Sequence, residues 1–275
     1  MSIQETFPEP EPQFYKHYGQ AWNRDKDTQA MGRVWELFLS MGRCRMSGIT
    51  YAEGSWGYTV LRTVYSDESH TLWPIVMEKM KRWVTQYFIH QNRLIKYKPD
   101  ASVNEELARR FILEIIEDKD SMELKLPDLA RANQSDIETL TKVFETWRDN
   151  AVGDVEFDPL DNPRFCDFLV IDENALRSLA ALPDNTPPLG PVTRAERRSR
   201  DKVFNLAHVW LVDSAAVRRF KGVEDADNYN GLMKLQASDV PNAWFERLAT
   251  FEMENFIFNR VQHLDESEDK WYCEH

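Results

Sequence analysis

The sequence predicts an α+β fold, with helices packed on a mixed or antiparallel sheet of three to five strands and a ferredoxin-like sandwich as the expected topology. Three observations lead to this. The stretch Trp56–Tyr65 is rich in the aromatic and β-branched residues that suit strands. An amphipathic helix follows at about Trp73–His90. Two later segments, Phe168–Arg177 and Val209–Arg218, each indicate an apolar strand that ends in an aspartate and runs directly into a helix.

Length and composition favour one large domain with short extensions. A chain of 275 residues, 42% apolar and 12% aromatic, can bury a substantial core. We expect an N-terminal tail over residues 1–29, where closely spaced prolines disfavour a helix, and an acidic C-terminal tail over 263–275. The single α+β domain is expected between them, at 30–262.

The Trp56–Tyr65 stretch is expected to be a central strand. Side chains alternate along a strand, so Tyr58, Val60 and Arg62 share one face while Thr59 and Leu61 point to the other. Neither face is cleanly polar, and we therefore expect both to be covered. Further strands are predicted at Phe165–Ile171 and Val203–Val212.

The helices are predicted from apolar spacing and capping residues. Pro74 suits the first turn of the Trp73–His90 helix, and its three basic residues Lys79, Lys81 and Arg82 are expected to face water. The segment Asn104–Asp120 fits both a helical stripe and strand alternation, and its length favours a helix.

Capping signals place several helix starts. Ser135 with Glu138 three residues later predicts a capping box, and Asp172 and Asp213 are expected to cap the helices that follow their strands. A last helix is predicted at about Pro241–Val261, with Ser238 or Asp239 as its cap.

The net charge and the targeting signals limit the classes of partner and the compartment that we expect. The formal net charge of −12 opposes non-specific binding to nucleic acid or to an anionic membrane. We find neither a signal peptide nor an apolar run long enough to span a bilayer. The three cysteines, expected as free thiols, fit a reducing compartment, and we predict a cytoplasmic protein.

Common catalytic and cofactor motifs are absent. The sequence has no glycine-rich dinucleotide or phosphate loop, no zinc-protease or paired-cysteine motif and no serine-hydrolase elbow. The six histidines show no ligand spacing. We therefore expect no metal and no cofactor.

Arg62 is the candidate site residue, because it lies between two valines on a strand that is expected to be covered on both faces. A buried guanidinium needs a charged partner, and Glu114 or Glu117 is the expected one. Such a group could bind a zwitterionic or carboxylate ligand or perform acid–base chemistry, or it could be a structural ion pair. Tyr58 and Trp210 are further candidates for lining a ligand site.

The block Trp56–Tyr65, with Ser69–Pro74 and Phe168–Asp172, resembles a group of uncharacterised fungal proteins over roughly Trp56 to Asp213. This resemblance implies a filamentous fungus as the source and a link to secondary metabolism. It implies no activity.

Two function classes follow. One is an intracellular binding or accessory protein, with a small molecule or a protein as its partner. The alternative is a metal- and cofactor-independent enzyme of secondary-metabolite biosynthesis that uses Arg62 with Glu114 or Glu117. Whether the chain is an enzyme stays open on the sequence alone.

Overall fold

A computed structural model describes the residues from Gln29 onward in ranges separated by gaps. These ranges are 29–49, 54–94, 101–117, 128–153, 162–184, 195, 203–204, 206–221, 230–248, 257–259 and 270–272. The predictions for the proline-rich N-terminal segment and for Cys273 fall outside them.

The centre of the fold is a mixed sheet of seven strands in the order β2-β1-β3-β4-β5-β7-β6. β1 pairs in parallel with both β2 and β3, and antiparallel pairing begins between β3 and β4. The strands are β1 (Thr59–Arg62), β2 (Glu114–Ile116), β3 (Asp167–Ile171), β4 (His208–Asp213), β5 (Leu232–Gln236), β6 (Ile257–Asn259) and β7 (Lys270–Tyr272).

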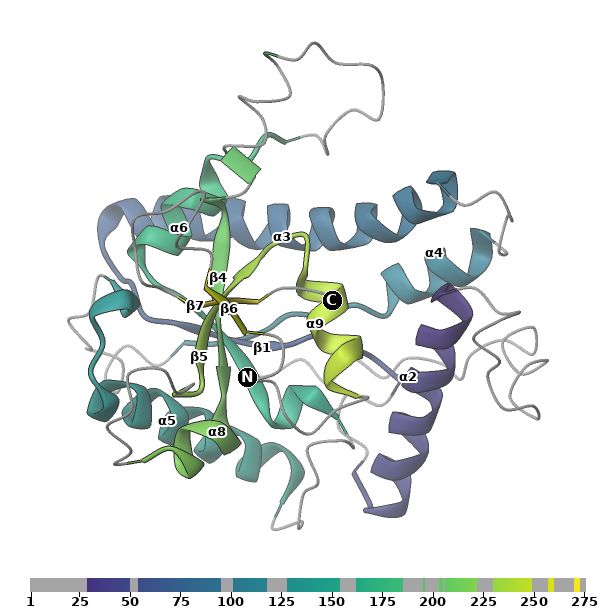
Figure 1. Cartoon of the computed structure of the whole chain (residues 1–275), viewed down its shortest axis with the longest axis horizontal. Helices are drawn as coiled ribbons and strands as arrows, with labels where there is room; N and C mark the ends of the chain where they lie inside the picture. Colours follow the sequence, from purple (N-terminus) through teal and green to yellow (C-terminus); the bar gives the residue numbers. More distant parts are fainter. Residues whose placement is uncertain are drawn as a thin grey trace.

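Helices cover both faces of this sheet (Figure 1). The α-helices are α2 (Gln29–Met46), α3 (Asp67–Leu94), α4 (Ala101–Arg109), α5 (Gln134–Val152), α6 (Glu173–Ala180), α8 (Ser214–Arg219) and α9 (Val240–Arg247). Two 3-10 turns, η1 (Leu129–Arg131) and η2 (Pro163–Phe165), precede α5 and β3. α3 contacts α4 and α6 on one side, and α5 contacts α8 on the other.

The two layers are anchored by aromatic side chains from opposite faces of the strands. Phe144 of α5 stacks on Phe168 of β3, with ring centroids 4.5 Å apart. On the other face, Trp73 of α3 covers Arg62 of β1. Arg62 pairs with Ile171 of β3, which is three residues after Phe168 and therefore faces the opposite side of the sheet. The expectation that both faces of the central strand are covered is confirmed, since all four residues of β1 are buried.

The α+β class is confirmed, but two details of the predicted sheet are wrong. The sheet has seven strands rather than three to five. It is not ferredoxin-like, because β1 lies directly between two parallel partners, whereas the ferredoxin topology splits its parallel pairs with another strand. Four strands were not predicted by position: β2, β6 and β7 have three residues each, too few for a periodic signal, and β5 has five.

The ambiguous segment Asn104–Asp120 is not one helix. Its first part belongs to α4, which ends at Arg109, and Glu114–Ile116 form β2. The expected helix is therefore wrong beyond Arg109, where the strand pattern applies to Glu114–Ile116. Gly57 (φ +123°) permits the close approach at this place, since a Cβ on it would lie 2.1 Å from the carbonyl oxygen of Ile112.

Part of the segment assigned to the acidic C-terminal tail belongs to the sheet. Lys270–Tyr272 form β7, which pairs with β5 and β6, and Trp271 and Tyr272 are buried. At the other end, the described part of the chain begins with α2 at Gln29. α9 ends at Arg247, well before the expected Val261, and Asp239 at its start makes no side-chain cap bond.

The predicted caps Asp172 and Asp213 are confirmed. Asp172 accepts from the backbone N–H of Ala175, and Asp213 accepts from two N–H groups of α8. The capping box at Ser135 is wrong, because Asn133 caps α5 and pairs reciprocally with Asp136. The pairs Asn133–Asp136 and Ser135–Glu138 have the same three-residue spacing, and the helix begins at the earlier pair.

Lys79, expected in water, is buried. Its ammonium group donates to the carbonyl oxygens of Ala180, the last residue of α6, at 2.7 Å and of Leu182 just beyond it at 2.6 Å. A cation at a helix C-terminus satisfies carbonyls that have no partner within the helix. Lys79 thereby ties α3 to α6.

Candidate functional site

The parallel strands β2, β1 and β3 end side by side, and Arg62 is the last residue of β1. From β1 the chain crosses through α3 and α4 to β2 at one edge, and from β3 it continues through α6 toward β4 on the other side. Neighbouring strands whose outgoing connections diverge form a switch point, where open α/β sheets commonly bind ligands. Arg62 lies at this point.

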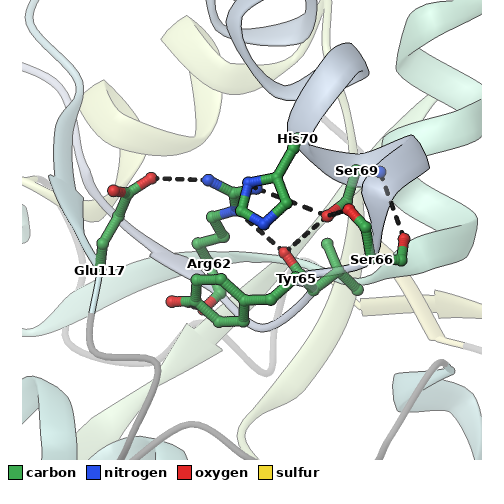
Figure 2. Close-up of polar contacts among 7 residues, drawn as sticks. Arg62, Tyr65, Ser66, Ser69, His70 and Glu117 are labelled. Atoms are coloured by element: carbon green, nitrogen blue, oxygen red, sulfur yellow. Dashed lines mark hydrogen bonds and ion pairs between the residues drawn. The ribbon is translucent and has the colours of Figure 1, made fainter.

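The guanidinium of Arg62 is held from several directions (Figure 2). Nε donates to the carbonyl oxygen of Val64 at 2.9 Å, and one Nη donates to Glu117 Oε1 at 2.9 Å. The other Nη lies 3.4 Å from the hydroxyl oxygen of Ser69 and 3.1 Å from Nδ1 of His70. A guanidinium only donates, so His70 accepts at Nδ1 and its ring carries the proton on Nε2.

Two aromatic rings fix the remaining surface of the guanidinium. The Cζ atom of Arg62 lies 4.9 Å from the ring centre of Tyr65 and 4.8 Å from that of Trp73. Tyr65 also donates from its hydroxyl to the carbonyl oxygen of Arg62 at 3.0 Å. These contacts leave the arginine little freedom to change its rotamer.

The turn between β1 and α3 is equally well fixed. Ser69 lies near the carbonyl oxygens of Ser66, at 2.8 Å, and Val64, at 3.0 Å, and donates its one proton there. Its backbone N–H donates to the hydroxyl of Ser66 at 3.2 Å. A strand that runs into a helix within five residues thus brings Tyr65, Ser69, His70 and Trp73 around Arg62.

The two ends of the Arg62–Glu117 pair differ in exposure. The side chain of Arg62 is 6% exposed and that of Glu117 is 50% exposed. His70 is exposed as well. The site therefore has a fixed, buried cation with a carboxylate and an imidazole on its solvent side.

Strand alternation decides which glutamate meets Arg62. Leu61 pairs with Ile116, so Glu117, one residue further along, follows the register to Arg62. Glu114 pairs with Thr59 and belongs to the other face. Of the two glutamates expected as partners, Glu117 is correct and Glu114 is not.

Tyr58 and Trp210 lie away from Arg62. Tyr58 precedes β1 and is fully buried toward the other end of the strand, close enough to Asp167 and Arg247 to interact with their charges. Trp210 on β4 donates from its indole N–H to Asp172 Oδ2 at 2.8 Å. Asp172 also accepts from the backbone N–H groups of Leu129 and Ala175, both at 2.7 Å, so its carboxylate joins η1, α6 and β4.

The sequence reasoning missed the residues that surround Arg62 from the β1–α3 turn. Nothing in the spacing of the residues between β1 and α3 indicates that this segment folds back over the strand. It also missed a second charged cluster, in which Arg247 of α9 meets Asp167 and Asp213 at the opposite end of the parallel strands.

Other findings concern metals, membranes and thiols. Within the described ranges, no three His, Cys, Asp or Glu side chains come together as a metal site. Nor does any helix in that part of the chain have the length and apolar character needed to cross a membrane. Cys44 and Cys166 are free, buried thiols.

Comparisons of the chain with family models, with curated proteins and with solved structures found no significant match.

Proposed function

We propose that this chain is an intracellular binding protein that takes a small carboxylate ligand on Arg62, at the carboxyl ends of β1 and β2. A guanidinium presents a planar fork that matches a carboxylate with two parallel hydrogen bonds. In the observed arrangement, Glu117 supplies one carboxylate oxygen to that fork. A ligand carboxylate would take the place of Glu117.

The observation that carries this proposal is the asymmetry of the ion pair. Val64, Tyr65, Ser69 and Trp73 contact the guanidinium through atoms that Glu117 does not touch. Glu117 is half exposed, so it can return to water without loss of buried surface. Exchange of one carboxylate for another then needs no movement of the arginine, and a preorganised cation binds with a smaller entropic cost.

A second observation supports a ligand here. The indole N–H of Trp73 is buried and has no acceptor among the described residues, although the ring lies against Arg62. A buried donor without an acceptor costs about 1–3 kcal/mol. A ligand oxygen is one group that could satisfy it.

An enzyme remains the alternative, because Glu117 and His70 flank the same guanidinium. A carboxylate and a neutral imidazole are the usual groups for general acid–base catalysis. The sequence resemblance suggests a link to fungal secondary metabolism under either proposal. Turnover of a bound acid would favour the enzyme.

The test is to titrate the protein with acetate, benzoate, citrate and inorganic phosphate and to measure binding by isothermal titration calorimetry. We expect saturable binding of at least one carboxylate, tighter in Glu117→Gln because the competing internal carboxylate is gone. Arg62→Gln should abolish binding. Arg177→Gln, which removes an exposed arginine paired with Glu68, is the matched control and should bind like the natural chain.

Absence of saturable carboxylate binding in both the natural chain and Glu117→Gln would contradict the proposal. So would binding that survives Arg62→Gln. Binding of phosphate in preference to every carboxylate would keep Arg62 as the site but change the ligand class.

A further inference from the structure

A fully buried charged cluster lies at the amino end of β3, away from the Arg62 site. Asp167 of β3 pairs in register with Asp213 of β4, and Arg247 at the end of α9 reaches both. Its Nε lies 3.0 Å from Asp167 Oδ2, and an Nη lies 3.3 Å from Asp213 Oδ2. The three side chains are 0%, 3% and 0% exposed for Asp167, Asp213 and Arg247.

Two carboxylates share one guanidinium in this cluster, so the ionised cluster would carry a net negative charge in a dry interior. A buried charge without compensation is expensive, and a proton on one carboxylate removes it. The contacts show which one. Asp213 Oδ1 accepts from the N–H groups of Ala215 at 2.9 Å and Ala216 at 3.0 Å, which favour its charged form.

Asp167 has no such support. Its Oδ1 has no hydrogen-bond partner among the described residues, and its Oδ2 faces only the guanidinium that Asp213 shares. The proton therefore belongs on Asp167. Burial, chiefly, raises the pKa of Asp167 to about 8, with a further upward contribution from Asp213 and an opposing one from Arg247.

Among the described residues, Arg247 and Asp213 are the charged groups that act on Asp167, and further titratable groups lie around the cluster. Tyr58 lies next to β1, and burial raises the pKa of its hydroxyl well above the ordinary value. Burial likewise raises the pKa of the Cys166 thiol, on which Arg148 of α5 also acts. Glu246 of α9 adds another acid, and it bonds to the hydroxyl of Tyr272.

Arg247 is also what ties the end of α9 to the sheet. Earlier in this helix, Trp244 and Phe245 pack on Trp56, with ring centroids 5.7 Å and 5.2 Å from it. α9 has only eight residues, too short to be stable without its packing. The charge state of the cluster therefore bears on whether α9 stays in place.

We propose that Asp167, Asp213 and Arg247 form a proton-dependent lock that holds α9 against the sheet while Asp167 keeps its proton. Opening of α9 admits water, Asp167 ionises, and the proton is released to solvent. Opening is therefore favoured as the pH rises. Release of one proton on opening makes the open population grow by up to about tenfold per pH unit until Asp167 is ionised in the closed form too.

Hydrogen exchange read by mass spectrometry tests the lock in the intact chain from about pH 5 to about pH 8. After correction for the intrinsic pH dependence of exchange, we expect protection of amides 240–247 to fall by up to about tenfold per pH unit. Protection of amides 134–152 in α5 should change less. Asp167→Asn, which mimics the protonated acid, should flatten the α9 profile.

Asp67→Asn removes an exposed aspartate and is the matched control, expected to keep the profile of the natural chain. A flat α9 profile in the natural chain would overturn the lock, whatever the variants do. An equal fall in α5 would also overturn it, because the whole fold would then be opening. An unchanged slope in Asp167→Asn would overturn the assignment to Asp167 and place the linkage on another group.

Discussion

Arg62 and Arg247 lie at opposite ends of the parallel strands, and each is buried beside an aspartate- or glutamate-bearing strand. They differ in the number and exposure of their acids. Arg62 meets one half-exposed carboxylate and is otherwise held by neutral groups and aromatic rings. Arg247 meets two carboxylates that are sealed from solvent.

This difference separates two uses of one ion-pair chemistry. Where water reaches the acid, the pair can exchange partners, because the acid loses little hydration when it pairs and regains it readily on leaving. Where water reaches neither group, the charges must balance inside the protein, and a proton supplies the balance. The first arrangement suits a ligand site, and the second suits a pH-dependent contact.

The largest effect should follow from removing Arg247. In Arg247→Met, Asp213 is left charged and buried without its cation, and we expect a loss of about 3–5 kcal/mol in unfolding free energy. Urea denaturation measures it. Part of the loss should return when Asp167 and Asp213 are also changed to Asn, and Arg177→Met, at an exposed pair, should cost far less. Equal losses of unfolding free energy in Arg247→Met and Arg177→Met would contradict the distinction between buried and exposed ion pairs.

The pH dependence of stability should separate the two ends next. The pKa of Asp167 is raised from 3.8 to about 8, so the folded state holds this proton more tightly than the unfolded chain does. Stability should therefore fall as the pH rises from about 4 to about 8, by up to about 1.4 kcal/mol per pH unit. The quantity to measure is the difference between the natural chain and Asp167→Asn in denaturant titrations. If the difference in unfolding free energy between the two proteins does not vary with pH, Asp167 does not hold a buried proton.

Removal of Arg62 should have a smaller effect. Arg62→Met loses the bond to Val64 and two cation–π contacts, and we expect a cost of about 2 kcal/mol. In a double-mutant cycle with Glu117→Gln, the coupling should stay below about 1 kcal/mol, because Glu117 is half exposed. Coupling of several kcal/mol would mean that the Arg62 pair is closed to water like the Arg247 cluster.

The smallest effect should come from Glu117→Gln alone. Loss of one partly solvated ion pair should change the unfolding free energy by less than about 1 kcal/mol. Chemical denaturation can detect a change of this size when the transition midpoints are compared with the m value held fixed. A larger loss would indicate that Glu117 supports the fold and is not replaced by a ligand.

Local patterns in the sequence were sufficient for several parts of the fold. Aromatic and β-branched runs marked β1, β3 and β4, and the aspartates after β3 and β4 were correctly identified as helix caps. These features succeed because strand propensity and capping depend on residues a few positions apart. Arg62 was singled out for the same reason, since its valine neighbours already implied a covered face.

Pairing between distant segments was decided only by the tertiary structure. β2 and β7 have three residues each and gain their stability from neighbours in the sheet, so the sheet order could not be read locally. The choice of Glu117 over Glu114 depends on the parallel register of β1 and β2. The charge imbalance around Arg247 exists only because β3, β4 and α9 bring Asp167, Asp213 and Arg247 together from far apart in the chain, in an interior where their charges cannot be screened by water.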